Sequence, residues 1–188
     1  KALLKLVMNL DATYGTNTSS DYRRNELQKK LVAPPLDLSF QKAPSRNAKD
    51  KFETSSLWLS SNSLTSMDGL VGLAKRILYD PLQLCWLDLS INEIRSISDE
   101  ITEFPNLKIL YLHGNNISDL NDVVKLRKLQ NLRSLSLHGN PIERIPYYRG
   151  YIIHILTQLS TLDFSAVLCA EKKRVEPAGF RTTIHMDT

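Results

Sequence analysis

The sequence predicts an α/β solenoid with about five parallel strands on a concave face, helices and turns on a convex face, and an extended N-terminal arm. Two observations carry this prediction. The pattern L-x-x-L-x-L-x-x-N-x-L recurs along the chain. Its asparagine falls at positions 62, 92, 115 and 140, so the copies follow one another at intervals of 30, 23 and 25 residues.

Three copies of the pattern are complete, and two are not. Thr54 stands where the first leucine of the earliest copy belongs. A period of about 20–29 residues is that of leucine-rich repeats, and four copies in phase argue against a chance match. The complete copies span residues 84–94, 107–117 and 132–142, after the earliest one and before a decayed one through Leu159, Leu162, Phe164 and Val167.

Each copy predicts one strand and one turn. The L-x-L segment is a short strand whose leucines point to one side. The asparagine follows where the chain turns out of the strand, and its amide can both donate and accept hydrogen bonds there. No repeat can bury its own leucines, so the copies must stack. We expect strands near residues 57–59, 86–89, 109–112, 134–137 and 161–164.

The segments between strands predict the convex side. Apolar residues at helical spacing predict a helix over residues 70–78 that ends at Asp80-Pro81. Later repeats return by shorter routes over residues 97–104 and 120–129. Pro146 suits the first turn of a further helix over residues 148–159. With the decayed copy, that helix predicts a cap over the C-terminal edge of the core.

Charge and composition divide the chain into three parts. Residues 1–51 form an extended basic arm of charge +5, residues 52–170 the repeat domain with its cap (−2), and residues 171–188 a charged tail (+1). Within the arm we expect short helices over residues 2–10 and 21–31, then an extended segment through Leu36, Leu38 and Phe40. The arm has no core of its own, so it either covers the open edge of the first repeat or docks on another protein.

The sequence also indicates the setting of the protein. No apolar run approaches the roughly 18 residues that span a bilayer, and Lys5 with the following polar run argues against a secretory signal peptide. Nothing in their spacing pairs Cys85 with Cys169, which favours free thiols in a reducing compartment. We expect a cytoplasmic protein that does not enter a membrane.

Several motifs carry a resemblance to known proteins. Asn140-Pro141, Tyr148-Arg149 and the L-x-x-L-D of residues 159–163 resemble the C-terminal cap of intracellular leucine-rich-repeat proteins. That group includes axonemal dynein light chain 1, the spliceosomal A-prime protein and phosphatase regulators of the sds22 type. More narrowly, PPLDLSF (34–40), LWL-x-x-N (57–62), WLDLS-x-N (86–92), LYLHGN (110–115) and LRSLSLHGNP (132–141) resemble the family of leucine-rich repeat-containing protein 51. The resemblance implies protein binding without catalysis, in a cytoplasmic and ciliary protein.

The residues between the strand leucines are the candidate binding site. Trp58, Trp86, Ile109 and Tyr111 fall on three neighbouring strands, about 4.8 Å apart, and predict one apolar patch. Grouped exposed aromatics usually mark a binding surface, although the arm is an alternative occupant. We assign partner binding on the concave face to Trp58, Trp86, Asp88, Ile109, Tyr111, His113 and His138. We assign a second contact to the arm, at Arg23, Arg24, Leu36, Leu38 and Phe40.

No pattern in the sequence indicates catalysis. His113 and His138 share a column on adjacent strands near Asp88, but the neighbouring positions lack the further ligands that zinc needs. We interpret them as strand histidines with local hydrogen bonds. The sequence has no Ser-His-Asp order, phosphate-binding glycine loop or C-x-x-C pair. We therefore expect no catalytic residues, no cofactor and no metal.

Two classes of function fit these features. The favoured one is a non-catalytic adaptor in a large cytoskeletal assembly, the motile-cilium axoneme, with tubulin or axonemal subunits as partners. The basic arm suits such acidic surfaces. The alternative is a ribonucleoprotein scaffold of the spliceosomal type or a phosphatase-regulatory subunit. Nucleic acid ranks lower because the arm offers few stacking aromatics beyond Tyr14, Tyr22 and Phe40.

Overall fold

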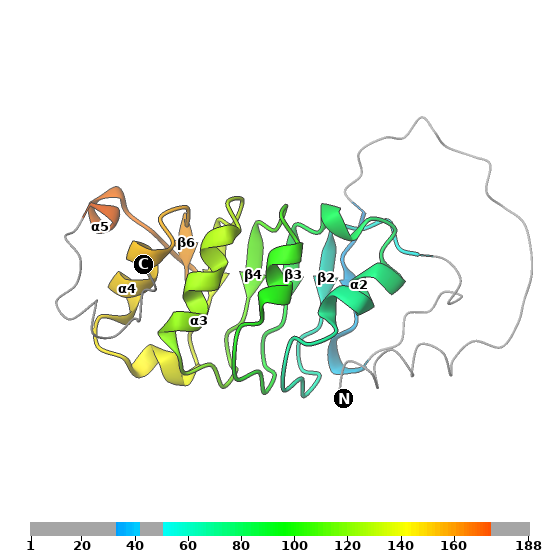
Figure 1. Ribbon diagram of the computed structural model, residues 1–188, viewed down its shortest axis with the longest axis horizontal. Helices are drawn as coiled ribbons and strands as arrows, with labels where there is room; N and C mark the ends of the chain where they lie inside the picture. The colour runs from blue at the N-terminus through cyan, green and yellow to red at the C-terminus, as the bar shows by residue number, and fades with distance from the viewer. Residues whose placement is uncertain (1–32, 42–50, 174–188) are drawn as a thin grey trace, which may run out of the picture.

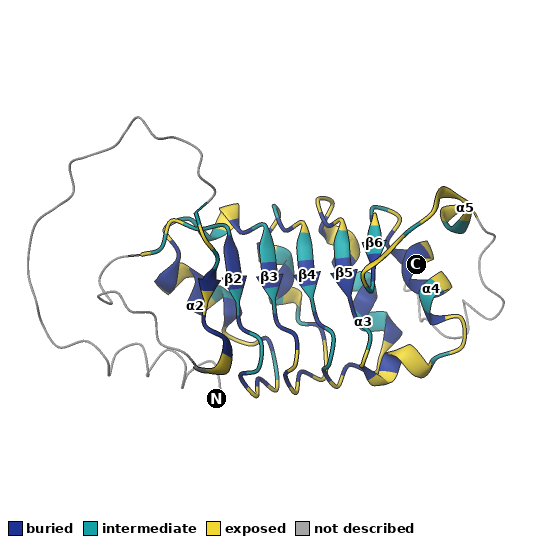
Figure 2. Cartoon of the chain, turned by 180° about the vertical axis from the view of Figure 1, so that it is seen from behind, coloured by how far each residue is buried: buried dark blue, intermediate teal, exposed yellow. Residues whose placement is uncertain are grey.

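The computed structural model describes residues 33–41 and 51–173, which form one sheet of seven strands in sequential order. Figure 1 shows helices α2 (Leu70–Ile77), α3 (Leu120–Val124) and α4 (Tyr148–Ile155) on one side of the sheet. Figure 2, which is turned by 180°, shows the opposite face of the molecule, where the strands lie next to one another. The short helices expected over residues 2–10 and 21–31, together with Arg23 and Arg24, lie outside the described residues.

Five parallel strands carry the repeats, as the sequence predicts. They are β2 (Ser56–Trp58), β3 (Trp86–Asp88), β4 (Ile109–Tyr111), β5 (Ser134–Ser136) and β6 (Thr161–Leu162). Their central leucines pair directly across the sheet and are fully buried: Leu57, Leu87, Leu110, Leu135 and Leu162. Each repeat thus adds the same apolar contact to one continuous core.

The asparagines form the expected ladder between repeats. Asn92 Oδ1 accepts hydrogen bonds from the backbone N–H of Asn62 (2.9 Å) and of Leu64 (3.0 Å). Asn92 Nδ2 donates to the carbonyls of Leu59 and Leu89, both at 3.0 Å. At positions 115 and 140 the amide oxygen accepts from one backbone N–H, of Ile94 and of Ile117, and the amide nitrogen again donates to two carbonyls. Each buried amide therefore satisfies backbone groups of two repeats at once.

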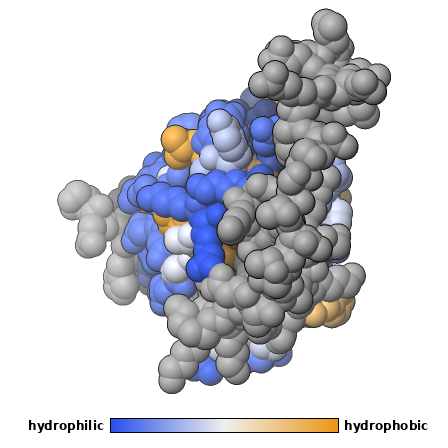
Figure 3. Space-filling view, turned by 90° about the vertical axis from the view of Figure 1, so that its right-hand side faces the viewer, coloured by the Kyte–Doolittle hydropathy of each residue, from blue (hydrophilic) through white to orange (hydrophobic). Residues whose placement is uncertain are grey.

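An additional strand closes the N-terminal edge of the sheet. Strand β1 (Leu36–Asp37) pairs in parallel with β2, and Leu36 (7% exposed) and Leu38 (0%) join the leucine core. The prediction that these two leucines bind a partner is therefore wrong, because the first repeat needs them to cover its own apolar edge. Phe40, which follows, stays 67% exposed. Seen end-on from this side, the visible described residues are mainly hydrophilic, with separate apolar spots (Figure 3).

The convex segments agree with the sequence prediction in position. Helix α2 fills the long first return, and Glu100 of the next repeat accepts from the backbone N–H of Gly69 (2.9 Å) and Val71 (3.0 Å) at its start. The later returns are short, and several are 3₁₀ turns. These are η3 (Asp99–Glu103), η4 (Lys125–Lys128) and η5 (Pro141–Arg144). Two more 3₁₀ turns lie earlier: η1 (Ser39–Gln41) precedes the first repeat, and η2 (Pro81–Gln83) ends the first return. No helix within the described residues has the length and apolar character to cross a bilayer.

The C-terminal cap forms around Asp163. The chain reverses after Leu162, and β7 (Ser165–Ala166) runs antiparallel to β6, so the strand expected to reach residue 164 stops early. Tyr148 of α4 donates to Asp163 Oδ2 (3.0 Å). Arg149 donates to the carbonyls of Leu162 (3.2 Å) and Ala166 (2.8 Å) and bonds Glu171 of α5 (Cys169–Lys172) at 2.8 Å. These contacts fix the last strands onto the solenoid.

Burial sets the protonation state of the cap tyrosine. Burial first, and then the adjacent Asp163 carboxylate, raise the pKa of Tyr148 far above its usual value. The hydroxyl therefore stays protonated and serves as the donor to Asp163. Elsewhere in the described chain, Cys85 and Cys169 are free thiols, as their spacing predicts.

Candidate protein-binding surface

Three aromatic rings from consecutive strands lie in contact on the open face of the sheet, the face opposite the helices. The ring centroids of Trp58 and Trp86 are 5.2 Å apart at an interplanar angle of 62°, and those of Trp86 and Tyr111 are 5.8 Å apart at 79°. Both pairs have the edge-to-face geometry that aromatic rings prefer. All three side chains are half-buried. The structure thus brings together the three aromatics that the sequence assigned to one patch, and Ile109 pairs directly with Trp86.

The row of rings continues to the C-terminal end of the sheet. Tyr111 contacts His113 (6.0 Å between centroids) and Phe164 (5.3 Å). His113 and His138 stack in parallel at 4.8 Å and 6°, and Phe164 lies 5.5 Å from each of them. We call the whole row the aromatic strip, which consists of Trp58, Trp86, Tyr111, His113, His138 and Phe164. It reaches from β2 to the turn after β6.

Phe164 is the member of the strip that sequence reasoning missed. The sequence places it in a leucine position of the decayed repeat, yet it is 58% exposed and lies over the open face. The one signal for this is Val167, which stands where the asparagine of that repeat belongs. Without the asparagine the ladder ends, and the chain turns back.

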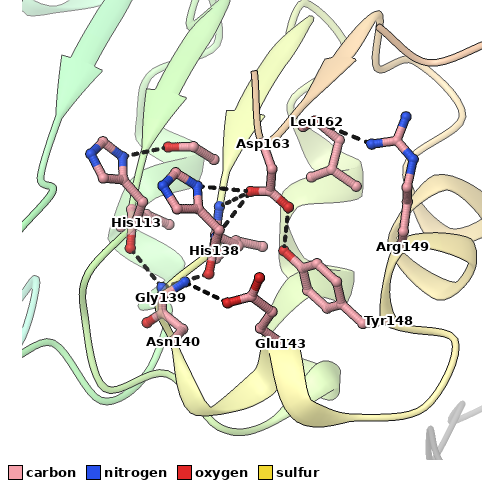
Figure 4. Close-up of polar contacts among 12 residues, drawn as sticks. His113, His138, Gly139, Asn140, Glu143, Tyr148, Arg149, Leu162 and Asp163 are labelled. Carbon is pink, nitrogen blue, oxygen red and sulfur yellow. Dashed lines mark hydrogen bonds and ion pairs between the residues drawn. The ribbon is translucent and has the colours of Figure 1, made fainter. Parts of the chain in front are cut away.

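A strained turn holds Phe164 in place. Asp163 (φ 50°) and Phe164 (φ 61°) are the two central residues between β6 and β7, and both lie in the left-handed region, as in a type I′ hairpin turn. That conformation is a rare one for a bulky residue. Asp163 stabilises it, because its Oδ1 accepts from the backbone N–H of Leu137 (2.7 Å) and His138 (2.9 Å), as Figure 4 shows around the cap. Strain of this kind concentrates at functional sites.

The two histidines have local partners. His113 Nδ1 lies 2.8 Å from Ser136 Oγ in a hydrogen bond (Figure 4). Burial first, and then His138, lower the pKa of His113, while Asp88 and Asp163 oppose that shift. His138 Nδ1 lies 3.5 Å from Asp163 Oδ1, within ion-pair range but without hydrogen-bond geometry. Within residues 33–41 and 51–173, no three His, Cys, Asp or Glu side chains gather as metal ligands would.

The tryptophan nitrogens carry a cost that folding does not explain. The Nε1 atoms of Trp58 and Trp86 are both buried without a hydrogen-bond partner among the described residues. A buried donor left unpaired costs about 1–3 kcal/mol. Leucine or serine at these positions would not carry an indole N–H that needs a partner.

Comparisons with known proteins agree with this architecture. The leucine-rich repeat family matches residues 45–184. Leucine-rich repeat-containing protein 51 of Bos taurus is 40% identical over 171 residues, which cover 82% of this chain and 89% of the relative. Its Homo sapiens counterpart is 37% identical with the same coverage.

Among solved structures, the Drosophila melanogaster SNF/U2A′ complex is similar, with a TM-score of 0.56 and 31% identity over 64% of this chain and 65% of that one. The match confirms the fold class, since both chains are stacked repeats with a parallel sheet. The sequence matches confirm the leucine-rich repeats and the narrower resemblance to leucine-rich repeat-containing protein 51. The chain therefore belongs to the leucine-rich repeat family and, within it, to the family of leucine-rich repeat-containing protein 51.

Proposed function

We propose that this chain is a non-catalytic adaptor for protein–protein interactions and that the aromatic strip is its main docking surface. The observation that carries this proposal is the set of large rings on a face that does not need them. Ser134 occupies the position on β5 that matches Trp86, and Ser136 the position that matches Tyr111. The same sheet therefore accommodates small residues at equivalent places, and the rings contribute little to the leucine core.

The size of the strip suits an interface. Burying one Trp or Tyr removes about 150–250 Å² from water, which contributes a few kcal/mol at about 25 cal/mol per Å². Trp and Tyr are also the residues that most often dominate binding energy in interfaces. A partner that covers two or three of these rings would gain enough to bind stably.

The proposed setting is a large cytoskeletal assembly, the motile-cilium axoneme, with tubulin or axonemal subunits as partners. Two features support it. The cap built on Tyr148, Arg149 and Asp163 resembles that of axonemal dynein light chain 1, and residues 1–51 carry a charge of +5 that suits an acidic surface. An axonemal adaptor should remain with salt-washed axonemes and be depleted from the detergent-soluble cytosol. Recovery in the soluble fraction alone would contradict this setting.

A ribonucleoprotein scaffold is the second candidate. Its support is the similarity to a chain of the SNF/U2A′ complex at a TM-score of 0.56. This candidate predicts recovery in nuclear ribonucleoprotein fractions and an affinity for RNA that falls steeply with salt. The phosphatase-regulatory alternative has only the resemblance of the cap in its favour.

The docking role is tested by comparing what the wild-type chain and its strip variants capture from native extract. Trp86→Ser and Tyr111→Ser should each lose a partner that wild type retains, by about 2 kcal/mol or more in affinity. Ser134→Ala on the same face is the matched control and should retain it. The partner, once identified by mass spectrometry, is then titrated as a purified protein. Equal affinity of all four chains would refute the proposal.

A further inference from the structure

Carboxylates and aromatic rings alternate along one level of the open face. Asp37 pairs directly with Trp58, Trp58 with Asp88, and Asp88 with Tyr111, across strands β1 to β4. Since adjacent strands lie about 4.8 Å apart, Asp88 has an aromatic neighbour on each side. Trp86, two residues earlier on the same face of β3, contacts both of those rings. Asp88 is therefore bordered by three aromatic side chains.

The charge of Asp88 is left without a cation. Its Oδ1 accepts from the backbone N–H of Ser90 at 2.9 Å. No Lys or Arg forms an ion pair with Asp88 in the described part of the chain, and none occupies an open-face position of β1 to β6. Asp163 differs in this respect, since three donors satisfy it. Asp88 thus presents a half-buried negative charge with one oxygen free of hydrogen bonds from the described residues.

This combination is suited to an organic cation. The face of an aromatic ring attracts a cation through its quadrupole, and Trp does so best. The carboxylate supplies the opposite charge, and its half-buried position weakens screening by salt. A guanidinium fits better than an ammonium, because it is planar, stacks on indole and donates directional hydrogen bonds to a carboxylate.

We propose that Trp58, Trp86, Tyr111 and Asp88 bind an arginine side chain on a basic segment of the partner protein. This inference rests on the docking role proposed above and specifies the chemistry of the partner. Charge complementarity selects that occupant: Asp37, Asp88 and Asp163 are the charged residues at the open-face positions of the described strands and their turn, and all are negative. A phosphate backbone would be repelled by the same charges.

The two tryptophans of the chain make the site directly observable. Trp58 and Trp86 are the only tryptophans in the sequence, so fluorescence excited selectively from tryptophan reports on this site. The full chain is titrated with a short glycine peptide that carries two arginines. The matched peptides carry lysine, glutamate, or citrulline, which has the shape of arginine without its charge. The tryptophan fluorescence should change saturably with the arginine peptide and more weakly with the lysine peptide. It should not change with the citrulline or glutamate peptide.

One variant isolates the carboxylate. Asp88→Asn keeps an oxygen that accepts from Ser90 N–H and removes the charge. It should therefore lower the affinity for the arginine peptide about tenfold. Asp99→Asn removes the same charge from an exposed position that pairs with Lys128 at 3.4 Å, and it should leave the affinity unchanged. Equal responses to arginine and citrulline, or an Asp88→Asn affinity equal to wild type, would overturn the assignment.

Three further outcomes separate the hypotheses. If the purified native partner needs Trp86 but binds Asp88→Asn normally, the docking role holds and the arginine site is wrong. If the partner ignores both variants while the peptide still distinguishes arginine from citrulline, the docking role fails and the cation site stands. If Arg23→Gln with Arg24→Gln changes the tryptophan fluorescence of the free chain, the occupant is the chain's own basic segment, and the partner assignment is overturned.

Discussion

The two faces of the same strands differ in how strictly they repeat. On the buried face, every strand from β2 to β6 places a leucine at the same register position, from Leu57 to Leu162. On the open face, one register level holds Trp58, Asp88, Tyr111 and then Ser136. Stacking requires the first kind of uniformity, because each repeat must bury the edge of the next. Stacking does not require the open face to repeat, and its departures from repetition support the proposal that this face binds a partner.

The largest loss of stability should come from breaking the uniform face. Leu87→Ala removes a fully buried side chain from the middle strand of the core and should cost about 2–5 kcal/mol of unfolding free energy. Urea denaturation followed by circular dichroism measures it. Ser134→Ala on the other face is the control and should unfold at nearly the wild-type midpoint. A wild-type midpoint for Leu87→Ala would mean that the core is not continuous.

The asparagine ladder should give the next largest effect. Asn115→Ala removes the acceptor for Ile94 N–H and the donor to the carbonyls of Leu89 and Leu112, which leaves buried backbone groups unpaired. The expected loss is about 1–3 kcal/mol. Asn116→Ala changes the exposed neighbouring residue and should leave the urea midpoint unchanged. Equal midpoints for the two variants would count against the ladder.

Two adjacent tyrosines of the C-terminal cap, one buried and one exposed, test whether a hydrogen bond secures the cap. Tyr148→Phe deletes the buried hydroxyl that donates to Asp163 and should cost about 1 kcal/mol. Tyr147→Phe changes a side chain that is 72% exposed and should cost almost nothing. Thermal melting of both variants measures the difference. A Tyr148→Phe melting temperature equal to that of Tyr147→Phe would show that the hydroxyl does not secure the cap.

The histidines of the open face should contribute the smallest effect, and only in acid. Burial and His138 lower the pKa of His113 in the folded chain below its ordinary value, against the opposing charges of Asp88 and Asp163. The unfolded chain therefore takes up a proton first as the pH falls through about 6.5. Stability is unaffected above that pH and declines below it. His113→Gln should flatten the decline between about pH 7 and pH 5, and an unchanged slope would contradict this.

The sequence predicts the repeated parts well, because repetition is what makes them recognisable. The five leucine strands, the asparagine ladder, helix α2 and the grouping of Trp58, Trp86 and Tyr111 all follow from one pattern and its register. The columns are predictable because side chains alternate along a strand. One shared register therefore determines which residues meet on each face.

The unrepeated ends are predicted less completely. Residues 36–38 are extended, as the sequence indicates, and they cover the edge of the first repeat, which is one of the two alternatives left open. The turn at Phe164 was not predicted. Strand β1 lacks the full pattern, although LDLS recurs at residues 36–39 and 87–90, with the same aspartate-to-serine turn bond of 2.9 Å in both. That recurrence is a local signal for a further strand. The signal for Phe164 was only Val167 in the asparagine position, because Asp-Phe is not a preferred pair for a left-handed turn. Hydrogen bonds from residues distant in sequence to Asp163 stabilise that turn, so the local sequence does not predict it.

We propose that the open face of the sheet binds the partner, whereas the buried face stabilises the fold. Two adjacent residues of β3, Trp86 and Leu87, separate the two roles. Trp86→Ser and Leu87→Ala are measured side by side for unfolding free energy and for affinity toward the purified native partner. Trp86→Ser should cost only about 1 kcal/mol, because the lost ring contacts are partly offset by removal of an unpaired indole N–H.

We expect Trp86→Ser to fold and lose the partner. We expect Leu87→Ala to be strongly destabilised, while its folded fraction binds at nearly wild-type affinity. The contradicting result is the reverse: Trp86→Ser unfolds as readily as Leu87→Ala while its folded fraction still binds the partner normally.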